Sequence, residues 1–271
     1  MPSVADPGHG RPGDYSSIRD PKREPLPVMI VLVTDYGMEG PYLGQVISVL
    51  YQFAPGVQVV NLFANAPTYD PRATAYLLAA YRHGFPKTSV FLCVVDPGVG
   101  SHPHAPIVVQ VDEQWFVGPG NGIFNAVMKR GGSSRAWKIT WRPKVISSTF
   151  HGRDLYAPVA ATLARGQFPH WEPLELSDYA TWPDDLHEII YLDHFGNAMT
   201  GVRASVVSPQ AAITIAGQRV PRFRTFSDVP VGHPMWYENS NGLAEIAVNQ
   251  GRADRVLDLC VGLPISFEEP T

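Results

Sequence analysis

The chain has few cysteines, no long uninterrupted apolar run and no signal-like N-terminus. Cysteine occurs only twice among 271 residues, at Cys93 and Cys260. Because the two lie far apart in separate apolar stretches, we expect two buried thiols in a reducing compartment. No segment approaches the roughly 20 consecutive apolar residues that a membrane helix requires. These absences predict a cytoplasmic protein with no membrane partner.

Clusters of basic residues are also missing. The net charge is −4 at neutral pH, and only 17% of the residues are charged. A protein that binds a phosphate backbone gathers Lys and Arg on one face, so we expect no nucleic-acid partner. By contrast, 45% of the residues are hydrophobic, which is enough apolar material for a globular fold. The length suggests two domains of modest size.

The order of the apolar patterns predicts an α/β fold. Residues 1–26 are rich in Pro, Gly, Asp and Ser, and we expect them to form a flexible tail. Residues 27–180 alternate buried runs with helical patterns, which predicts an N-terminal domain with a mainly parallel sheet flanked by helices. Residues 187–271 contain short alternating segments, ending with VLDLCVG at 256–262. They predict a smaller, barrel-like antiparallel β domain.

Carboxylates stand where two of the predicted strands end. Asp35 of the segment TDYG follows a strand predicted at 28–34, and Asp96 of the segment DPGVG follows one predicted at 89–95. Ligands of open parallel sheets bind beyond the carboxyl ends of the strands. A single Asp at a strand end often only caps a turn, but two together favour a site at this edge.

A histidine and an Arg-Asp pair form a second polar cluster, in the segment SSTFHGRD. His151 precedes a glycine, which permits close backbone approach, and opposite charges follow at Arg153 and Asp154. A lone histidine is more often structural, but these neighbours make acid–base chemistry an equal alternative.

His102 and His104 could form a metal-binding pair. Pro103 between them restricts the geometry, and neither an HExxH motif nor a cysteine pair supports such a site. We therefore expect no metal.

Two polar segments occur in the C-terminal half. Asp193, Phe195 and Asn197 lie in the segment DHFGN, and Ser240 lies in the segment ENSNG. Asn and Phe suit a purine, by edge hydrogen bonds and stacking, while Asp suits an amine. Each segment could also be an ordinary turn, but together with the strand-end carboxylates they indicate a small, nucleoside-like ligand.

Seven spaced motifs resemble those of one known family. In chain order they are VTDYGMEGPYLG, YDPRATAYLLA, VFLCVVDPGVG, WFVGPGNGIF, SSTFHGRDLYAPVAA, LDHFGN and NSNGLAEIAVNQG. The chain resembles the adenosine-forming S-adenosyl-L-methionine (SAM) hydrolases, also called SAM hydroxide adenosyltransferases, from about residue 28 to residue 263. These enzymes are relatives of fluorinase and chlorinase.

The resemblance implies an enzyme that hydrolyses SAM to adenosine and L-methionine. Water or hydroxide would attack the ribose C5′, and methionine would leave as a neutral thioether. SAM is then the substrate, and no cofactor or metal is expected. The resemblance also implies a homotrimer whose active sites lie between the N-terminal domain of one subunit and the C-terminal domain of the next.

Eight residues take roles by this resemblance. Asp96 and His151 match two members of the Asp-Arg-His set that positions the attacking water. The substrate-binding matches are Asp35 at the ribose hydroxyls, Tyr69 over the sugar and sulfonium, Asp193 at the methionine ammonium, Ser240 near its carboxylate, and Phe195 with Asn197 at the adenine.

The arginine of the set is missing. In the family pattern DPGVG is followed by Thr or Ser, one variable residue and arginine, whereas this chain has Pro103 in the arginine position. Proline offers neither charge nor donor. His102 or His104 could substitute, or Arg72 or Arg153 could reach the site.

Three alternatives remain open at this point. The chain could bind SAM or an adenosine derivative with weak or no turnover, because the arginine is absent. It could transfer halide to SAM, although the negative charge of Asp96 would repel an anion. A metal-dependent hydrolase is the third alternative.

Overall fold

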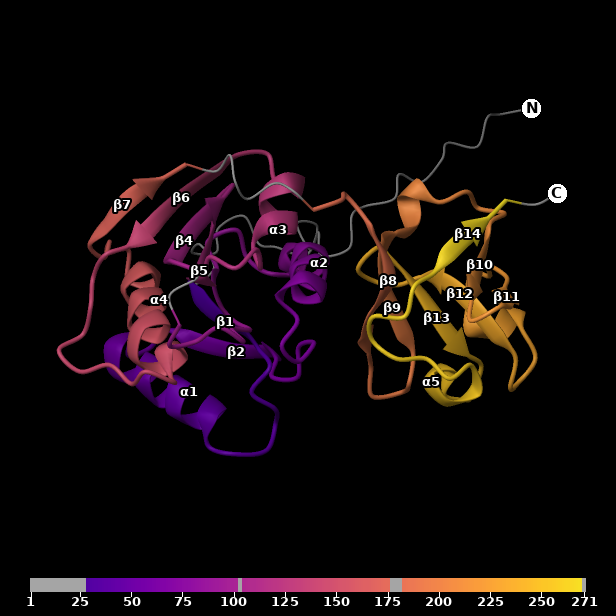
Figure 1. The fold of residues 1–271 in the computed structure, drawn as a ribbon, viewed down its shortest axis with the longest axis horizontal. Coiled ribbons are helices and arrows are strands. Elements are labelled where there is room, and N and C mark those ends of the chain that lie inside the picture. Colours follow the sequence, from indigo (N-terminus) through magenta and orange to yellow (C-terminus); the bar gives the residue numbers. More distant parts are fainter. Residues whose placement is uncertain (1–27, 102–103, 176–181, 270–271) are drawn as a thin grey trace, which may run out of the picture.

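The structure, a computed structural model, describes residues 28–101, 104–175 and 182–269. Figure 1 shows a larger body of sheet and helices beside a smaller body of β-strands. The tail expected at residues 1–26 lies outside the described residues. Within the described ranges, no helix is long and apolar enough to cross a membrane.

One seven-stranded sheet, ordered β2-β1-β3-β5-β4-β6-β7, forms the centre of the larger body. Its strands are β1 (Met29–Thr34), β2 (Gln58–Phe63), β3 (Val90–Val94), β4 (Pro106–Val111), β5 (Gln114–Pro119), β6 (Ser134–Ile139) and β7 (Trp171–Leu174). The first four in sheet order are parallel, and the remaining pairs are antiparallel. The predicted α/β sheet is confirmed. Its direction changes at β4 and β5, which a two-residue turn joins as a hairpin.

Helices cover both faces of this sheet. The α1 helix (Tyr42–Phe53) and the α4 helix (Ala157–Ala164) share a core with Ile30 and Leu32 of β1. The α2 helix (Pro71–Tyr81) and the α3 helix (Asn125–Arg130) lie on the opposite face, over Val31 and Val33. Alternate residues of β1 therefore enter two different cores, which explains its continuous apolar run. The carboxylate of Asp70 caps α2 by accepting a hydrogen bond from the Ala73 N–H at 2.9 Å.

The smaller body contains two antiparallel sheets. One is ordered β12-β13-β9-β8 and the other β11-β10-β14. Their strands are β8 (Leu186–Leu192), β9 (Ala198–Arg203), β10 (Ala212–Ile215), β11 (Gln218–Val220), β12 (Pro234–Glu238), β13 (Leu243–Val248) and β14 (Ser266–Glu268). Side chains of both sheets, among them Ile213, Trp236 and Ile246, enclose one core. The predicted antiparallel character of this half is confirmed.

The segment VLDLCVG differs from its prediction as a strand. It begins at the last residue of the short α5 helix (Ala253–Val256) and continues as a turn, with Asp258 at φ +52°. Leu257 and Leu259 are buried, but Cys260 is exposed. The prediction of a buried thiol is thus correct for Cys93 and wrong for Cys260, because an apolar neighbourhood in sequence does not fix which side chains of a turn face inward.

Four further short helical segments occur within the described ranges. They are η2 (Arg82–Gly84), η3 (Gly152–Tyr156), η4 (Ala204–Val206) and η5 (Phe226–Asp228), of which η3 is a π-helical turn that continues into α4.

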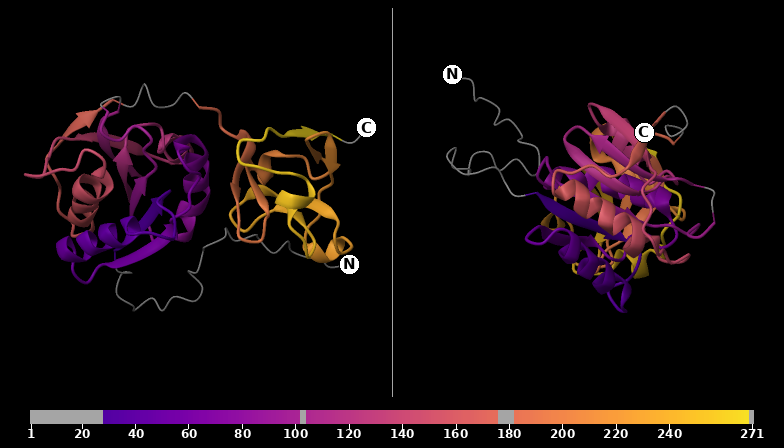
Figure 2. Two further views of the ribbon diagram at one scale, coloured as in Figure 1. Left: turned by 60° about the horizontal axis from the view of Figure 1, so that its bottom comes forward. Right: turned by 90° about the vertical axis from the view of Figure 1, so that its left-hand side faces the viewer.

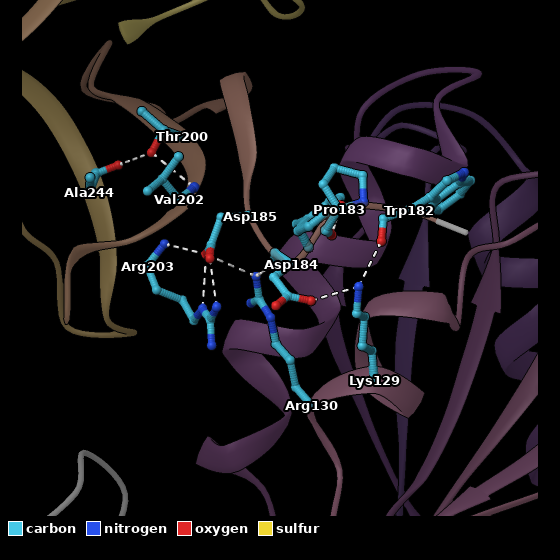
Figure 3. A network of polar contacts seen from close by, with 11 residues as sticks. Lys129, Arg130, Trp182, Pro183, Asp184, Asp185, Thr200, Val202, Arg203 and Ala244 are labelled. Atoms are coloured by element: carbon cyan, nitrogen blue, oxygen red, sulfur yellow. Dashed lines mark hydrogen bonds and ion pairs between the residues drawn. The ribbon is translucent and has the colours of Figure 1, made fainter. Parts of the chain in front are cut away.

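A polar network and the α2 helix join the two bodies. The smaller body lies on the α2 side of the large sheet, where α2 contacts β8 (Figure 2). Next to this contact, the Asp185 carboxylate pairs with Arg203 at 2.5 Å and with Arg130 at 3.4 Å (Figure 3). Burial alone would raise the pKa of Asp185, but the hydrogen bonds from Arg203 hold it below its usual value.

Candidate active site

The two strand-end carboxylates leave the large sheet at the same edge. Thr34 at the end of β1 pairs in register with Val94 at the end of β3, so Asp35 and Asp96 follow neighbouring strand ends. Burial raises the pKa of both carboxyls, and the charge of Asp35 raises that of Asp96 further. The sheet edge therefore holds two partly desolvated acids side by side.

Asp35 also fixes the position of Tyr69. The Tyr69 backbone N–H donates a hydrogen bond of 3.0 Å to the Asp35 carboxylate. Tyr69 has a φ of +59°, a conformation that costs energy for a residue with a side chain, and its side chain is 74% exposed. The structure thus brings these two predicted ligand residues together and leaves the phenol ring open to a ligand.

Asp96 and His151 line one small cavity of about 180 Å³, together with His104. The Gly98 N–H donates to the Asp96 carboxylate at 3.2 Å. Burial is the main influence and raises the pKa of Asp96, while the two imidazoles partly oppose it. The predicted catalytic pair is therefore adjacent, and His104 faces the same carboxylate. His102 and Pro103 lie outside the described residues.

The DPGVG loop packs closely on the turn before His151. Gly100 has a φ of +81°, and a β-carbon at this position would collide with the Ser148 carbonyl oxygen. Glycine is required here for both reasons. This backbone contact sets the distance between the Asp96 loop and the His151 turn.

The predicted ligand residues of the C-terminal half line a second, larger cavity of about 820 Å³. All four, Asp193, Phe195, Asn197 and Ser240, contribute to its wall. The Asp193 carboxylate accepts hydrogen bonds from the backbone and side-chain amides of Asn197, at 2.8 and 3.0 Å. The Phe195 ring is 70% exposed. This cavity offers an acid, an amide and an aromatic face.

Sequence reasoning missed Glu245 at the wall of this larger cavity. Its side chain accepts hydrogen bonds from the Tyr237 hydroxyl at 2.5 Å and from the Asn239 amide at 2.8 Å. Burial raises the pKa of Glu245, and burial together with Glu245 raises that of Tyr81 to about 12. The available signal was a glutamate inside the otherwise apolar strand LAEIAV.

The two cavities share no lining residue. Asp96 and His151 line the small one, whereas the four C-terminal ligand residues line the large one. Within the part of the chain that the structure describes, no three His, Cys, Asp or Glu side chains converge as a metal site would. The chain therefore presents these two groups of residues in two separate cavities.

Family models match both bodies. A SAM hydroxide adenosyltransferase N-terminal domain matches residues 30–172, and a SAM hydroxide adenosyltransferase C-terminal domain matches residues 187–266.

Curated relatives match most of the chain. An "(R)-S-adenosyl-L-methionine hydrolase" of Thermus thermophilus is 37% identical, over 87% of this chain and 98% of that protein. A protein of the same name from Salinispora tropica is 33% identical, over 86% and 95% respectively. A "Fluorinase" of an Actinoplanes species is a more distant relative, 21% identical over 88% of this chain and 96% of its own.

Solved structures share the fold. A crystal structure of an uncharacterized conserved protein from Thermotoga maritima has a TM-score of 0.75 and 28% identity, covering 88% of this chain and 99% of its own. A conserved hypothetical protein from Thermus thermophilus has a TM-score of 0.72 and 33% identity, over 89% and 100%.

Proposed function

The chain belongs to the SAM hydroxide adenosyltransferase family, and we propose that it hydrolyses SAM to adenosine and L-methionine. The observation that carries the proposal is the small cavity that Asp96 and His151 both line. This cavity lies at the sheet edge that also carries Asp35, the residue proposed to bind the ribose hydroxyls. The activity printed for the relatives from Thermus and Salinispora supports the same reaction.

The chemistry needs little from the protein beyond orientation and proton removal. The oxygen of water forms a bond to the ribose C5′ while the bond between C5′ and sulfur breaks. The electron pair of the broken bond stays on the sulfur of methionine. The sulfonium is already a good leaving group. Asp96 and His151 would hold the water in line and accept its proton, which then passes to bulk solvent.

The remaining site residues bind the substrate in this proposal. Their proposed contacts are Asp35 with the ribose hydroxyls, Tyr69 with the sugar and sulfonium, Asp193 with the methionine ammonium, Ser240 with its carboxylate, and Phe195 and Asn197 with the adenine. The open Tyr69 and Phe195 rings support the two stacking roles.

We further propose that each complete active site joins two subunits of a homotrimer. The support is that the small and the large cavity share no lining residue. Within one chain, the proposed water-binding residues and the proposed adenine- and methionine-binding residues therefore line different cavities. The domains would be residues 27–180 and 187–271, and the location cytoplasmic. The reaction itself would require no metal and no cofactor.

The experiment is incubation of the protein with SAM, followed by chromatography for adenosine and methionine. We expect both products in equal amounts from the wild type and none above background from His151→Ala. Lys144→Gln, a change at an exposed residue near the same turn, serves as the control. The reaction is repeated with chloride and with a strong chelator.

Each alternative function predicts a different result in this experiment. A 5′-chloro product in chloride would show halide transfer, and loss of activity in chelator would show a metal-dependent hydrolase. Saturable SAM binding without any product would show a binding protein. Resolved diastereomers of SAM test the (R) preference that the names of the relatives suggest.

A further inference from the structure

The small cavity around Asp96 and His151 is also lined by residues for which the sequence predicted no role. Arg142, three residues beyond β6, and Tyr156, at the end of η3, line it. We propose that Arg142 is a positioning residue that supplies the permanent positive charge of the water site, in place of the arginine that the resemblance leads one to expect at Pro103. This inference rests on the proposed hydrolase function.

Backbone hydrogen bonds anchor the Arg142 side chain beside the cavity. Its Nη1 donates to the carbonyl oxygens of Ile139 and Trp141, at 2.7 and 2.8 Å. A guanidinium carries five N–H groups in a fixed plane, and these two bonds use only those on Nη1. The charge is therefore held against the end of β6, while the N–H groups of Nε and Nη2 are not used by these bonds.

Tyr156 lines the same small cavity as Arg142 and Asp96. It is 2% exposed, and burial is the main cause of its strongly raised pKa. The charge of Asp96 raises this pKa further, whereas Arg142 lowers it. The Tyr156 hydroxyl thus lies within electrostatic reach of both side chains. Because it stays neutral at physiological pH, it can donate a hydrogen bond to the carboxylate or to a bound water.

The two arginines that the sequence suggested as substitutes are engaged elsewhere. Arg153 bonds Asp154 at 2.6 and 3.1 Å and Gln45 at 2.8 Å, with its guanidinium over the Phe150 ring. Burial raises the pKa of Tyr76 and of Glu188, and the charge of Arg72 partly opposes this rise. Neither of these two residues lines the small cavity. Neither arginine is needed to account for a positive charge at the water.

His104 is the other basic group facing Asp96 besides His151. Histidine changes its charge between about pH 5 and pH 8, whereas arginine remains charged throughout. A permanent charge near the cavity stabilises the negative charge that develops on the attacking water. Arg142 would supply this positive charge throughout that pH range.

The test compares Arg142→Gln, Arg142→Lys and the exposed control Lys144→Gln. We expect Arg142→Gln to lower kcat about 10- to 100-fold, with KM for SAM nearly unchanged, as for other residues that orient a catalytic group. The acidic limb of its pH–kcat profile moves to higher pH, because a lost positive charge makes deprotonation of the site harder. The titratable groups that face Asp96 are Asp35, His104, His151, Tyr36 and Tyr156, and the two tyrosines stay protonated across this limb.

Arg142→Lys decides the case if the glutamine variant unfolds, because lysine retains the charge. Recovery of the wild-type acidic limb in this variant supports the proposal, and so does restoration of Arg142→Ala by added guanidinium. A folded Arg142→Gln with wild-type kcat and pH profile overturns the proposal. Loss of kcat with a shifted acidic limb in His104→Gln would then assign the role to His104. A wild type that releases no adenosine contradicts the proposed function instead.

Discussion

The phenol oxygen of Tyr36 lies in the space that a side chain at Gly152 would occupy. An ideal β-carbon at Gly152 would overlap this oxygen and stand 3.1 Å from the Cζ atom of the ring. The Tyr36 ring also packs edge-on against Phe150, with centroids 5.7 Å apart. The segment TDYG, which carries Asp35, therefore fixes the segment FHGRD, which carries His151.

Gly152→Ala should displace Tyr36 or the His151 turn. We expect the free energy of unfolding to fall by about 1–3 kcal/mol, the usual cost of overpacking, and adenosine release to fall with it. Denaturant unfolding measures the first effect. Adding Tyr36→Phe should restore most of the stability, because the overlapping atom is then absent.

A matched control for this variant is Gly44→Ala in α1, where nothing lies within 4 Å of the added carbon. This change should stabilise the protein by up to about 1 kcal/mol. Equal stability of Gly152→Ala and the wild type would show that the Tyr36 contact is not rigid.

Asp96→Asn should abolish turnover and yet stabilise the fold near neutral pH. Burial raises the pKa of Asp96 above its unfolded value, so the folded state binds this proton more tightly than the unfolded state. Folding stability is therefore lost as pH rises from the unfolded pKa of Asp96 through its higher folded pKa. The asparagine variant has no charge to bury and does not lose this stability. Thermal unfolding at several pH values measures the difference.

The advantage of Asp96→Asn should disappear below about pH 4, where the unfolded carboxyl is also protonated. Adenosine release should fall by at least about 100-fold at all pH values. A variant that is less stable than the wild type at neutral pH would contradict the assigned cost of burying this charge.

Glu245→Gln should weaken SAM binding more than it slows the chemical step. Glu245 holds Asn239, whose side-chain oxygen accepts from the N–H groups of Asn241 and Leu243 at 2.9 and 3.0 Å. This arrangement shapes the loop that carries Ser240. We expect KM for SAM to rise about tenfold, the effect of one charge-assisted hydrogen bond, with kcat nearly unchanged.

Glu238→Gln is the control for this variant, because Glu238 lies in the adjacent strand with its side chain half exposed. It should leave KM within about twofold of the wild-type value. An unchanged KM in Glu245→Gln would place the buried carboxylate outside the binding machinery.

Asp185→Asn should loosen the junction between the two bodies. Its carboxylate pairs with Arg203 and Arg130 and is only 10% exposed, so we expect a loss of about 2 kcal/mol in unfolding free energy at neutral pH. Because its folded pKa is depressed, this contribution is lost as pH falls through the folded pKa. Asp184→Asn, at a side chain that is 64% exposed, should change little; equal effects of the two changes would refute the assignment.

Sequence-based prediction succeeded where neighbouring residues decide the structure. Asp70 and Pro71 identified the start of α2, since a cap and a first-turn proline act within one turn. The strand ends at Asp35 and Asp96 were likewise local signals. Parallel pairing then placed both carboxylates at one edge.

Sequence-based prediction failed where packing decides. The exposure of Cys260 depends on a turn after α5, which its apolar neighbours do not determine. Glu245 and Arg142 gain their meaning only from the cavities that they line. No local pattern separates Arg142 from any other surface arginine.

The most direct test of the proposed reaction is hydrolysis of SAM in H₂¹⁸O, with mass analysis of both products. Attack of water on C5′ predicts one ¹⁸O atom in the 5′-hydroxyl of adenosine and an equal amount of unlabelled methionine. Adenosine without the label, or adenine in place of adenosine, would contradict the account.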